Sequence, residues 1–591
     1  MKTDKWIIAT LFFSIFLYAE PITKEKPFDN LPIKTEIKKD KLKDIAKEDN
    51  KTSILDKVQI DLALKLTKKR VSLPKEISHK KRFLKRFYRQ NSYLPLWFDS
   101  KGISKKSSEL FKIIEDDITL NKEGKIYKRY LYLKSYLKSK DRDNTHAELY
   151  LTVLYIDFLN HTIYGSIKWK SFSLQLKNFR RRGIPANWVT YKPKFSISEL
   201  LLKPNIKDTI NEVTPKRFGY SRLLKALKKL IELKKRGGWE QLPHIKKLEL
   251  GDKGLIVLKL RERLEASGDI AVCESTAVNL FEAEDSEEAD IKIQPEATFD
   301  KCLEDGVKNF QARHGLEADG IVGSATRKIL NITVEDKIKK VLLNIDRVKW
   351  LPREEDKRYI IVNIPEFMLH YIEDGKEKDT IPVIVGKKRH NTPIFKGDIS
   401  YIVLNPYWKV PEGIVRKEII PHMIRNPRYL RKEGLEIHVN WYEKSRKINP
   451  YNIYWEDYYN GYMKFPYRIM QPPGPKNALG KIKFKFPNRF NVYLHDTPTK
   501  RLFQKTKRAY SHGCIRVSKP VKLFETIASF NNIDLNKSKK ILKGKTKVQI
   551  NIENVVPVYI IYLTAGYSEK NKEVEFRNDV YGYDKIQKRV D

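Results

Sequence analysis

Apolar residues change their spacing along the chain, and the change predicts two kinds of structure. Between residues 76 and 247 they recur at steps of three and four, which is the period of amphipathic helices and predicts helices such as Ser107–Asp117 and Ala147–Leu159. Beyond a connector at 333–357, residues 358–556 hold runs of β-branched and aromatic residues separated by turn residues. We therefore expect a multidomain α+β protein in which a helical domain precedes a mainly β domain.

The expected strands of the β domain are short, and one long stretch interrupts them. Residues 414–470 break the strand pattern with a polar and aromatic insertion, which we interpret as a lid over a cleft. The last residues, 557–591, are expected to pack on the preceding domains. The first four strands are predicted at Tyr359–Ile364, Phe367–Ile372, Ile381–Val385 and Ile399–Val403.

A smaller helical domain is expected at 248–332, between the two larger ones. Its pattern predicts helices at Leu255–Ala266 and Phe299–His314. The acidic stretch Glu274–Asp290 lies between these helices and interrupts what would otherwise be a compact unit.

A turn motif follows the second of these helices. Asp319-Gly320 predicts a tight turn, and Gly323 is expected to take a positive φ. Ser324 is then expected to cap a short helix that runs through Leu330.

The N-terminal part of the chain has two further segments. Residues 20–75 are rich in Lys, Asp and Glu with few aromatics, which predicts a flexible linker, and their cluster Ile60–Leu66 predicts at most a loose amphipathic helix. Residues 1–19 have the pattern of a secretory signal, two lysines followed by the apolar run Trp6–Tyr18. We expect export to the periplasm, and an uncleaved signal anchored in the inner membrane is the open alternative.

The charge balance raises nucleic acid as a partner, and the distribution of the charges argues against it. The chain has 591 residues, with 117 Lys and Arg against 74 Asp and Glu and a formal net charge of +43. Such an excess can neutralise phosphates. The lysines are dispersed and form no single basic helix, and an exported protein does not meet nucleic acid. We expect no nucleic-acid partner, and favour an anionic envelope polymer or a solvated surface.

Three cysteines, Cys273, Cys302 and Cys514, are expected in an oxidising compartment. Cys273 and Cys302 flank the acidic stretch and are candidates for a disulfide, a pairing that the sequence leaves open. Cys514 is then the odd thiol. An odd thiol in an exported chain is a candidate nucleophile, and a small buried hydrophobic residue is the alternative.

A candidate catalytic pair consists of Cys514 and a histidine that precedes it in the sequence. His495 ends an expected strand, and Cys514 comes shortly after it in the segment Ser511-His512-Gly513-Cys514. A thiol with an ordinary pKa of about 8.5 is a weak nucleophile at neutral pH, and a nearby imidazole can accept its proton. Gly513 lets the backbone approach a substrate carbonyl, so that N–H groups stabilise an oxyanion. No cluster has zinc-ligand spacing, and we expect no metal and no cofactor.

This segment, with its upstream histidine, is similar to the signature of the YkuD-type L,D-transpeptidases. The resemblance implies that Cys514 is the nucleophile and His495 the proton acceptor and donor, oriented by the main-chain carbonyl of Asp496 before its carboxylate. It also implies that Tyr493 contributes to the oxyanion site, and a packed strand aromatic is the alternative for that residue.

The remaining site residues are carried over from the same family by position. Ser511, His512 and Gly513 are implied to shape the catalytic loop, with Ser511 also near the substrate. Arg516 is implied to support the loop or contact a substrate carboxylate, although some members have Asn there. Asn477 is implied to bind substrate.

The resemblance extends beyond the signature. The segments Gln471–Gly480, Lys483-Phe484 and Phe486–Asn488 are similar to those of the large, lid-bearing transpeptidases of Gram-negative bacteria, whose parts follow the same order. That order implies a scaffold role for the helical domain at 76–247. Phe310-Gln311 together with Asp319–Gly323 resembles the small peptidoglycan-binding domain of cell-wall hydrolases.

What the resemblance implies is acyl transfer on peptidoglycan. Cys514 would attack the L-centre carbonyl of a diaminopimelate in a tetrapeptide stem, release D-Ala and form a thioester, which an amine of another stem takes in a 3-3 cross-link. Exchange with a free D-amino acid, hydrolysis as an L,D-carboxypeptidase and a non-catalytic wall-binding scaffold are the open alternatives. Expected partners are stem peptides, the glycan and other cell-wall enzymes, with membrane contact only through an uncleaved signal.

Overall fold

The computed structural model describes residues 53–68, 72–191, 193–270, 297–353, 356–461, 463–568 and 573–587. By their internal contacts the residues form two compact units, Met1–Ser104 with Arg142–Tyr150, and Lys105–Asp141 with Leu151–Asp591. The expected signal at 1–19, Cys273 and the acidic stretch Glu274–Asp290 lie outside the described residues.

The smaller unit corrects the expectation of a linker. Its helix α2 begins at a capping box, in which Ser53 and Asp56 each accept from the other's backbone N–H, and its apolar side chains Val58, Leu62 and Leu66 are buried. The linker interpretation is wrong for this stretch because its apolar residues share one covered helical face, which outweighs its charged composition. The elements are α2 (Ile54–Thr67), α3 (Lys75–Ser78), α4 (Lys81–Gln90), β1 (Phe98–Asp99) and β2 (Gly102–Ile103).

A buried carboxylate holds this unit together. Glu148 is fully buried, accepts from Tyr88 Oη at 2.7 Å, and accepts from the backbone N–H groups of Leu96 and Trp97 at 2.7 and 3.0 Å. A buried charge with this many donors is stabilised as the carboxylate.

Helices lead the larger unit, and the two helices singled out above are confirmed. The expected helices Ser107–Asp117 and Ala147–Leu159 correspond to α5 and α7. The helices up to the small domain are α5 (Lys105–Asp116), α6 (Lys125–Tyr136), α7 (Asn144–Tyr164), α8 (Trp169–Arg181), α9 (Ile197–Leu202), α10 (Ile206–Val213) and α11 (Tyr220–Lys235).

The small domain has its own apolar core, formed around Leu260, Leu303 and Phe310. The two predicted helices are confirmed as α12 and α13. Cys302 on α13 is disulfide-bonded, while its pairing with Cys273 stays a prediction because Cys273 is not described. The helices are α12 (Leu255–Ser267), α13 (Lys301–Arg313), α14 (Ser324–Leu330) and, leading to the sheet, α15 (Val334–Val348).

The turn before α14 differs from its prediction. Gly323 is the N-cap with φ −83°, not a positive-φ residue, and Ser324 is the first helical residue and caps nothing. The positive φ falls at Gly320, at +79°. The side chain of Gln311 explains the difference, because it accepts from Gly320 N at 2.9 Å and donates to Asp319 Oδ1 at 2.7 Å, which holds the tight turn at Asp319-Gly320.

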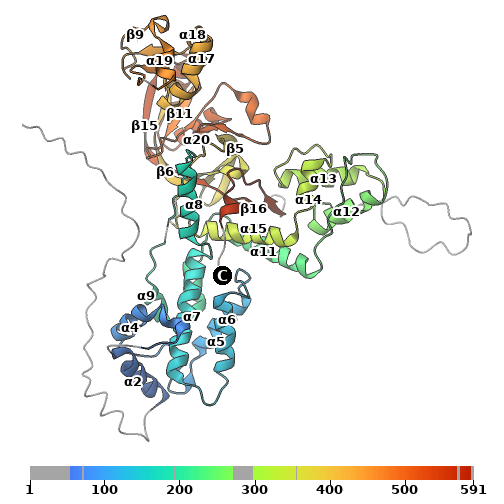
Figure 1. Ribbon diagram of the computed structural model, residues 1–591, viewed down its shortest axis with the longest axis vertical. Helices are drawn as coiled ribbons and strands as arrows, with labels where there is room; N and C mark the ends of the chain where they lie inside the picture. Colours follow the sequence, from blue (N-terminus) through green and yellow to red (C-terminus); the bar gives the residue numbers. More distant parts are fainter. Residues whose placement is uncertain are drawn as a thin grey trace, which may run out of the picture. The chain divides into compact units, whose positions relative to one another are not determined.

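A nine-stranded sheet of the described residues carries the larger unit (Figure 1). Its strand order is β13-β5-β14-β12-β11-β6-β15-β3-β4, and β5 also pairs with β4, so the sheet closes on itself. The four predicted strands are confirmed as β3 to β6. The strands are β3 (Arg358–Asn363), β4 (Met368–Glu373), β5 (Lys376–Gly386), β6 (Phe395–Leu404), β11 (Ile482–Lys485), β12 (Leu494–His495), β13 (Ala509–Ser511), β14 (Ile515–Val517) and β15 (Val548–Ile561).

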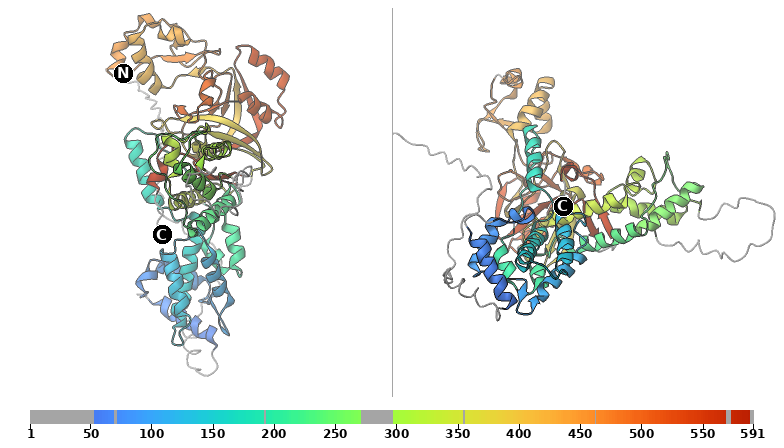
Figure 2. Two further views of the ribbon diagram at one scale, coloured as in Figure 1. Left: turned by 90° about the vertical axis from the view of Figure 1, so that its right-hand side faces the viewer. Right: turned by 60° about the horizontal axis from the view of Figure 1, so that its bottom comes forward.

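The lid has a sheet and a core of its own. In both views of Figure 2 its orange ribbon forms a separate group beside the strands of the main sheet. Its core is built on Ile419, Met423 and Trp455. The elements are β7 (Trp408–Lys409), α16 (Glu412–Ile414), the π-helix η4 (Val415–Ile419), α17 (Ile420–Arg425), α18 (Tyr429–Glu433), β8 (Glu436–His438), β9 (Lys447–Ile448), η5 (Pro450–Asn452), α19 (Trp455–Tyr459) and β10 (Arg468–Gln471).

The last elements surround and follow the sheet. β15 continues to Ile561, beyond the boundary expected at 556. No helix in the described ranges is long and apolar enough to cross a membrane. The elements are η3 (Ile364–Glu366), η6 (Lys500–Gln504), α20 (Pro520–Ala528), α21 (Leu535–Lys543), β16 (Ala565–Ser568), β17 (Glu573–Phe576) and α22 (Tyr583–Ile586).

Candidate active site

Strand register places the histidine and the cysteine on one face of the sheet. β12 and β14 run parallel, with Leu494 opposite Ile515 and His495 opposite Arg516. Leu494 and Ile515 are fully buried in the core, so their neighbours His495, Cys514 and Arg516 all face the opposite side. Adjacent strands are about 4.8 Å apart, and the two functional side chains are therefore diagonal neighbours.

The loop before β14 holds Cys514 through a network of its own. Ser511 is buried, and its hydroxyl accepts from Gly513 N at 3.1 Å and donates to the carbonyl of Cys514 at 2.5 Å. Gly513 has φ +112°, a conformation that favours glycine. The hydroxyl of Ser511 is committed to this loop, which fits the loop-shaping role expected for it and leaves no hydrogen for a substrate contact.

The thiol of Cys514 is free and half-buried. Its Sγ lies 3.8 Å from the carbonyl oxygen of Asn491, and no hydrogen bond joins it to His495 in the described structure. Burial raises the pKa of the Cys514 thiol, and contacts with Tyr493 and the charge of Lys483 oppose that rise. In structures without substrate, catalytic hydrogen bonds are often longer than in the reacting complex.

His495 is buried and oriented by the backbone. Its Nδ1 donates to the main-chain carbonyl of Asp496 at 2.5 Å, which leaves Nε2 as the acceptor. The carboxylate of Asp496 bonds elsewhere, accepting from Lys481 N at 2.8 Å and from Lys500 Nζ at 2.5 Å. Burial lowers the pKa of His495 to about 3, with the charge of Arg516 as the second cause, so the ring is neutral at physiological pH.

Two lysines to which the sequence assigned no role in the site lie on the same face. On β11, Lys483 is the direct strand partner of His495. Its Nζ lies 4.0 Å from the centroid of the Tyr493 ring, and Lys485 Nζ lies 5.2 Å from it. Tyr493 is half-buried, and burial raises the pKa of its hydroxyl. The sequence signal was the alternation Ile482-Lys483-Phe484-Lys485, in which every second residue is polar.

His512 faces the lid. Its Nε2 lies 2.6 Å from Glu418 Oε1 on η4, and its ring centroid lies 4.7 Å from that of His390. The insertion at 414–470 thus contacts the loop of Cys514 through a hydrogen bond between two partly exposed side chains.

Asn477 has a structural role, which corrects the expectation that it binds substrate. The residue is 1% exposed. Its Nδ2 lies within hydrogen-bond distance of the carbonyls of Pro406, Gln471 and Pro472 at 2.9 to 3.0 Å, and its Oδ1 accepts from Leu479 N at 2.8 Å. Every polar atom of the amide is committed to the loop before β11, so none is left for a ligand.

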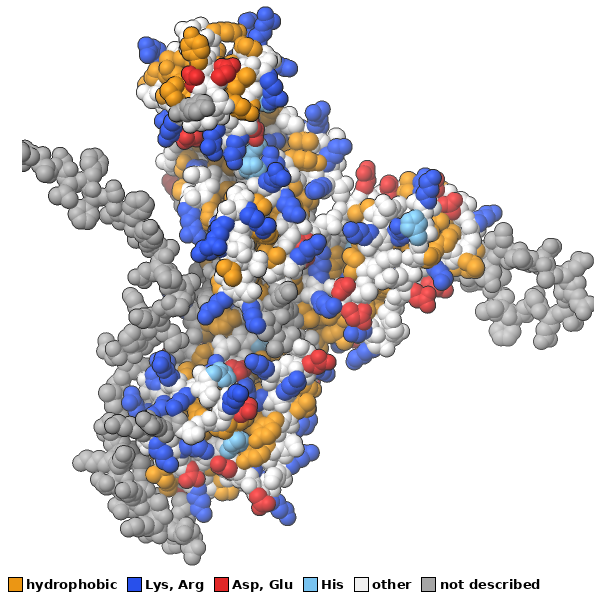
Figure 3. Space-filling view, in the orientation of Figure 1, with side chains coloured by type: hydrophobic (Ala, Val, Ile, Leu, Met, Phe, Trp, Pro, Cys, Tyr) orange, Lys and Arg blue, Asp and Glu red, His pale blue; other side chains and the backbone are white. Residues whose placement is uncertain are grey.

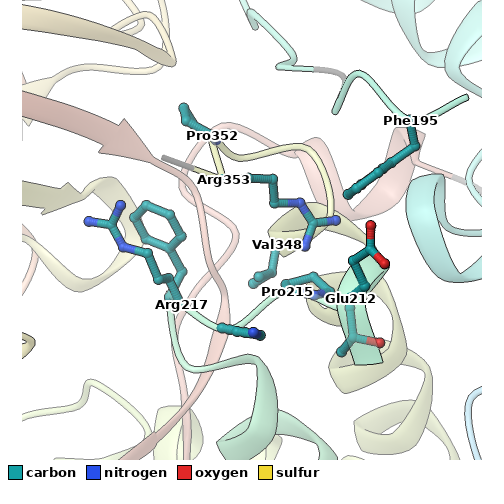
Figure 4. A pocket seen from close by; sticks show the side chains of 10 residues that line it. Phe195, Glu212, Pro215, Arg217, Val348, Pro352 and Arg353 are labelled. Atoms are coloured by element: carbon teal, nitrogen blue, oxygen red, sulfur yellow. The ribbon is translucent and has the colours of Figure 1, made fainter. Parts of the chain in front are cut away.

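Two cavities of the described structure lie away from these residues. One, of about 170 Å³, is lined by Phe195, Glu212 and Arg353 among others (Figure 4). The other, of about 260 Å³, includes Trp239 and Lys337. Neither is lined by His495, Cys514, Tyr493 or Lys483. No group of His, Cys, Asp and Glu within the described ranges has the arrangement of a metal site.

Three parts of the chain match known domain families. Residues 357–550 match the family described as the YkuD L,D-transpeptidase catalytic domain. Residues 82–227 match a family described as a scaffold domain, and residues 287–330 match one described as a "Putative peptidoglycan binding domain". The catalytic face described above lies within the first of these matches.

Relatives point the same way. A protein of Haemophilus influenzae, "Putative L,D-transpeptidase", is 33% identical over 260 residues, which cover 44% of this chain and 50% of that protein. The chain thus spans about half the length of this relative.

Solved structures of L,D-transpeptidases are also similar. One from Mycobacterium smegmatis has 11% identity, covers 34% of this chain and 58% of its own, and has a TM-score of 0.16. One from Stackebrandtia nassauensis has 15% identity, covers 54% and 96%, and has a TM-score of 0.19. These scores carry no weight for the fold. The family matches do, and by them the chain carries a YkuD-type L,D-transpeptidase catalytic domain together with a scaffold domain and a peptidoglycan-binding domain.

Proposed function

We propose that the protein is a peptidoglycan L,D-transpeptidase in which Cys514 is the nucleophile and His495 the proton acceptor and donor. The observation that carries this proposal is the shared face of β12 and β14, where a free thiol and a neutral, backbone-oriented imidazole are diagonal neighbours. Stem peptides are the acyl substrate and the glycan is the ligand of the peptidoglycan-binding domain.

The first half-reaction forms a thioester. His495 Nε2 accepts the thiol proton, and the sulfur attacks the L-centre carbonyl of the diaminopimelate in a tetrapeptide stem. The carbonyl oxygen becomes an oxyanion, which the N–H groups of the Gly513 loop and the hydroxyl of Tyr493 stabilise. When the oxyanion collapses, the carbon–nitrogen bond to D-Ala breaks, and the imidazolium of His495 returns its proton to the leaving amine.

The second half-reaction uses the same groups in reverse. The side-chain amine of another diaminopimelate attacks the thioester, His495 accepts the amine proton, and the sulfur leaves as the new amide forms. The product is a 3-3 cross-link and the thiol is regenerated.

The same proposal assigns the remaining parts of the chain. Residues 1–19 are an export signal for the periplasm, cleaved or kept as an inner-membrane anchor, and 76–247 and 248–332 are the scaffold and peptidoglycan-binding domains. Arg516 supports the loop or contacts a substrate carboxylate, and the lid at 414–470 covers the bound stem. By this proposal the protein belongs to the large, lid-bearing transpeptidases of Gram-negative bacteria. Other cell-wall enzymes are its proposed partners.

Incubation of the full chain with tetrapeptide-bearing muropeptides tests the proposal. The wild type is expected to release D-Ala and form 3-3 dimers. Cys514→Ala is expected to form neither and to unfold at the wild-type temperature, because the substitution removes one half-buried sulfur and no core side chain.

Two outcomes would contradict the assignment. Dimers formed by Cys514→Ala at the wild-type rate would exclude the nucleophile. Tripeptide monomer from the wild type, with no dimer in the presence of excess acceptor stem, would replace the transferase with the carboxypeptidase.

A further inference from the structure

The catalytic face carries more positive charge than the reaction described above uses. Lys483 and Lys485 lie on β11, and register puts Lys483 directly beside His495. Arg516 completes the set on β14, again as a strand partner of His495. Three cations thus line the face on which Cys514 lies, from the strands on both sides of β12.

No carboxylate of the described chain lies within 4.0 Å of Lys483 Nζ or Lys485 Nζ. Other lysines near the sheet do have one, as Lys500 has Asp496 and Lys522 has Asp379. Figure 3 shows Lys and Arg side chains scattered over the visible face, with fewer Asp and Glu side chains among them. A half-buried ammonium group without a counterion is destabilised as a cation.

The surroundings of Lys483 are positive on every side except one. Lys409 of β7, Lys485 of β11 and Lys547 before β15 repel it, and the neutral His495 offers no charge. Burial, followed by the repulsion from Lys485, lowers the pKa of Lys483 to about 8. Among the charges that act on Lys483, that of Cys514 is the one that raises its pKa, so the ammonium attracts the sulfur when the sulfur is ionised.

Tyr493 makes the arrangement specific. Its ring lies under the Lys483 ammonium, whose Nζ is 4.0 Å from the ring centroid, and its hydroxyl interacts with Cys514, which directly precedes β14. Cation–π contact of this kind fixes an ammonium group over a ring face. The lysine is therefore held at the catalytic face and does not extend into solvent.

We propose that Lys483, assisted by Lys485, is the electrostatic partner that stabilises the thiolate of Cys514. The inference rests on the proposed function, in which that thiolate is the nucleophile. Lys483 transfers no proton and forms no bond. Its charge lowers the free energy of the ionised sulfur, and the same charge disfavours the imidazolium of His495, so the proton moves on readily to the leaving amine.

The reactivity of the thiol tests this inference without peptidoglycan. Cys302 is disulfide-bonded, so iodoacetamide alkylation of the full chain, followed by intact mass at a series of pH values, reports the ionisation of Cys514. Lys483→Met keeps the length of the side chain and removes its charge. We expect the pH midpoint to rise by about one unit, which is a roughly tenfold lower alkylation rate below the midpoint.

Two further variants separate charge from packing. Lys483→Arg keeps the charge and is expected to keep the wild-type midpoint. Lys507→Met removes one charge from an exposed lysine of the same domain and is expected to change nothing. Lys485→Met is expected to raise the midpoint by a smaller amount, and it serves as the test if Lys483→Met does not fold.

The outcomes distinguish this inference from the function on which it rests. An unchanged midpoint in folded Lys483→Met, or in Lys485→Met where the first variant fails to fold, would overturn the inference, and so would an equal rise in Lys507→Met. If Cys514→Ala retains cross-linking, the proposed nucleophile fails instead, whatever the alkylation midpoints are.

Discussion

Tyr581 lies in the C-terminal segment, well after Cys514 in the sequence. Removal of its hydroxyl is nevertheless expected to disturb the loop that holds Cys514. Tyr581 is buried, and its Oη donates to the carbonyl of Gly386 at 2.9 Å and accepts from Thr392 N at 3.1 Å. Thr392 Oγ1 then donates to the carbonyl of Gly513 at 2.8 Å, next to the proposed nucleophile. The C-terminal segment is thus connected to the loop of Cys514 through two buried residues.

The magnitude follows from the groups left without partners. Tyr581→Phe keeps the ring and opens no large cavity, but a buried C=O and a buried N–H each lose a hydrogen bond. A buried polar group without a partner costs about 1–3 kcal/mol. We therefore expect the variant to lose about 2–6 kcal/mol of unfolding free energy, and acylation of Cys514 to slow by roughly tenfold as Gly513 shifts.

Urea unfolding and acylation kinetics measure these two effects. Tyr567→Phe is the matched control, because the hydroxyl of Tyr567 on β16 is partly exposed and makes no hydrogen bond in the described structure. The control is expected to stay within about 0.5 kcal/mol of the wild type. Wild-type stability and acylation in Tyr581→Phe would refute the reasoning, and a loss of stability with normal acylation would refute the connection to Gly513.

Two further predictions concern a glycine and a buried ion pair. Gly480 has φ +58°, and a Cβ there would lie 2.3 Å from the carboxylate of Asp496, so Gly480→Ala is expected to lower stability by about 1–3 kcal/mol in thermal unfolding; unchanged stability would contradict it. Burial opposes the charges of His370 and Glu366, but their attraction raises the pKa of His370 to about 10 and lowers that of Glu366 to about 2. The stability from His370 is complete below its ordinary pKa of 6.5 and is lost as pH rises toward 10, while that from Glu366 is complete above 4.5 and is lost as pH falls toward 2. In urea titrations His370→Gln is expected to abolish the alkaline loss, and an alkaline loss equal to that of the wild type would contradict this.

The spacing of apolar residues predicted helices and strands well where the buried side chains of an element recur at regular intervals. The alternation in β3 to β6 and the three- and four-residue steps of α5 and α7 needed no partner to be recognised. The pattern recognised α2 only as a loose helix at Ile60–Leu66 within a linker, and it failed at Gly323, where the side chain of Gln311, twelve residues earlier, decides the turn. Both differences depend on contacts that composition does not carry.

The residues of the candidate site also fall into those that the sequence predicted and those that it did not. Cys514 and His495 stand in a motif, so sequence alone singled them out. Glu418 and Lys483 received no site role from the sequence, because each reaches the site through tertiary structure: Glu418 lies 94 residues before His512, and Lys483 becomes a neighbour of His495 through the pairing of β11 with β12. Asn477 shows the opposite case, since a motif position turned out to be a buried loop staple.

Register links these observations into one physical argument. Leu494 and Ile515 are fully buried, and a one-residue slip of either strand would put an apolar side chain on the open face and a polar one in the core. The core therefore enforces the register that makes His495 and Cys514 diagonal neighbours. The register of β11 is fixed in the same way, because Phe484 is fully buried in the core. Its neighbour Lys483 must therefore face the same side of the sheet as His495. The positive charge beside the thiol is thus a consequence of the apolar residues beneath it, and changing the core of these three strands would change the chemistry above them.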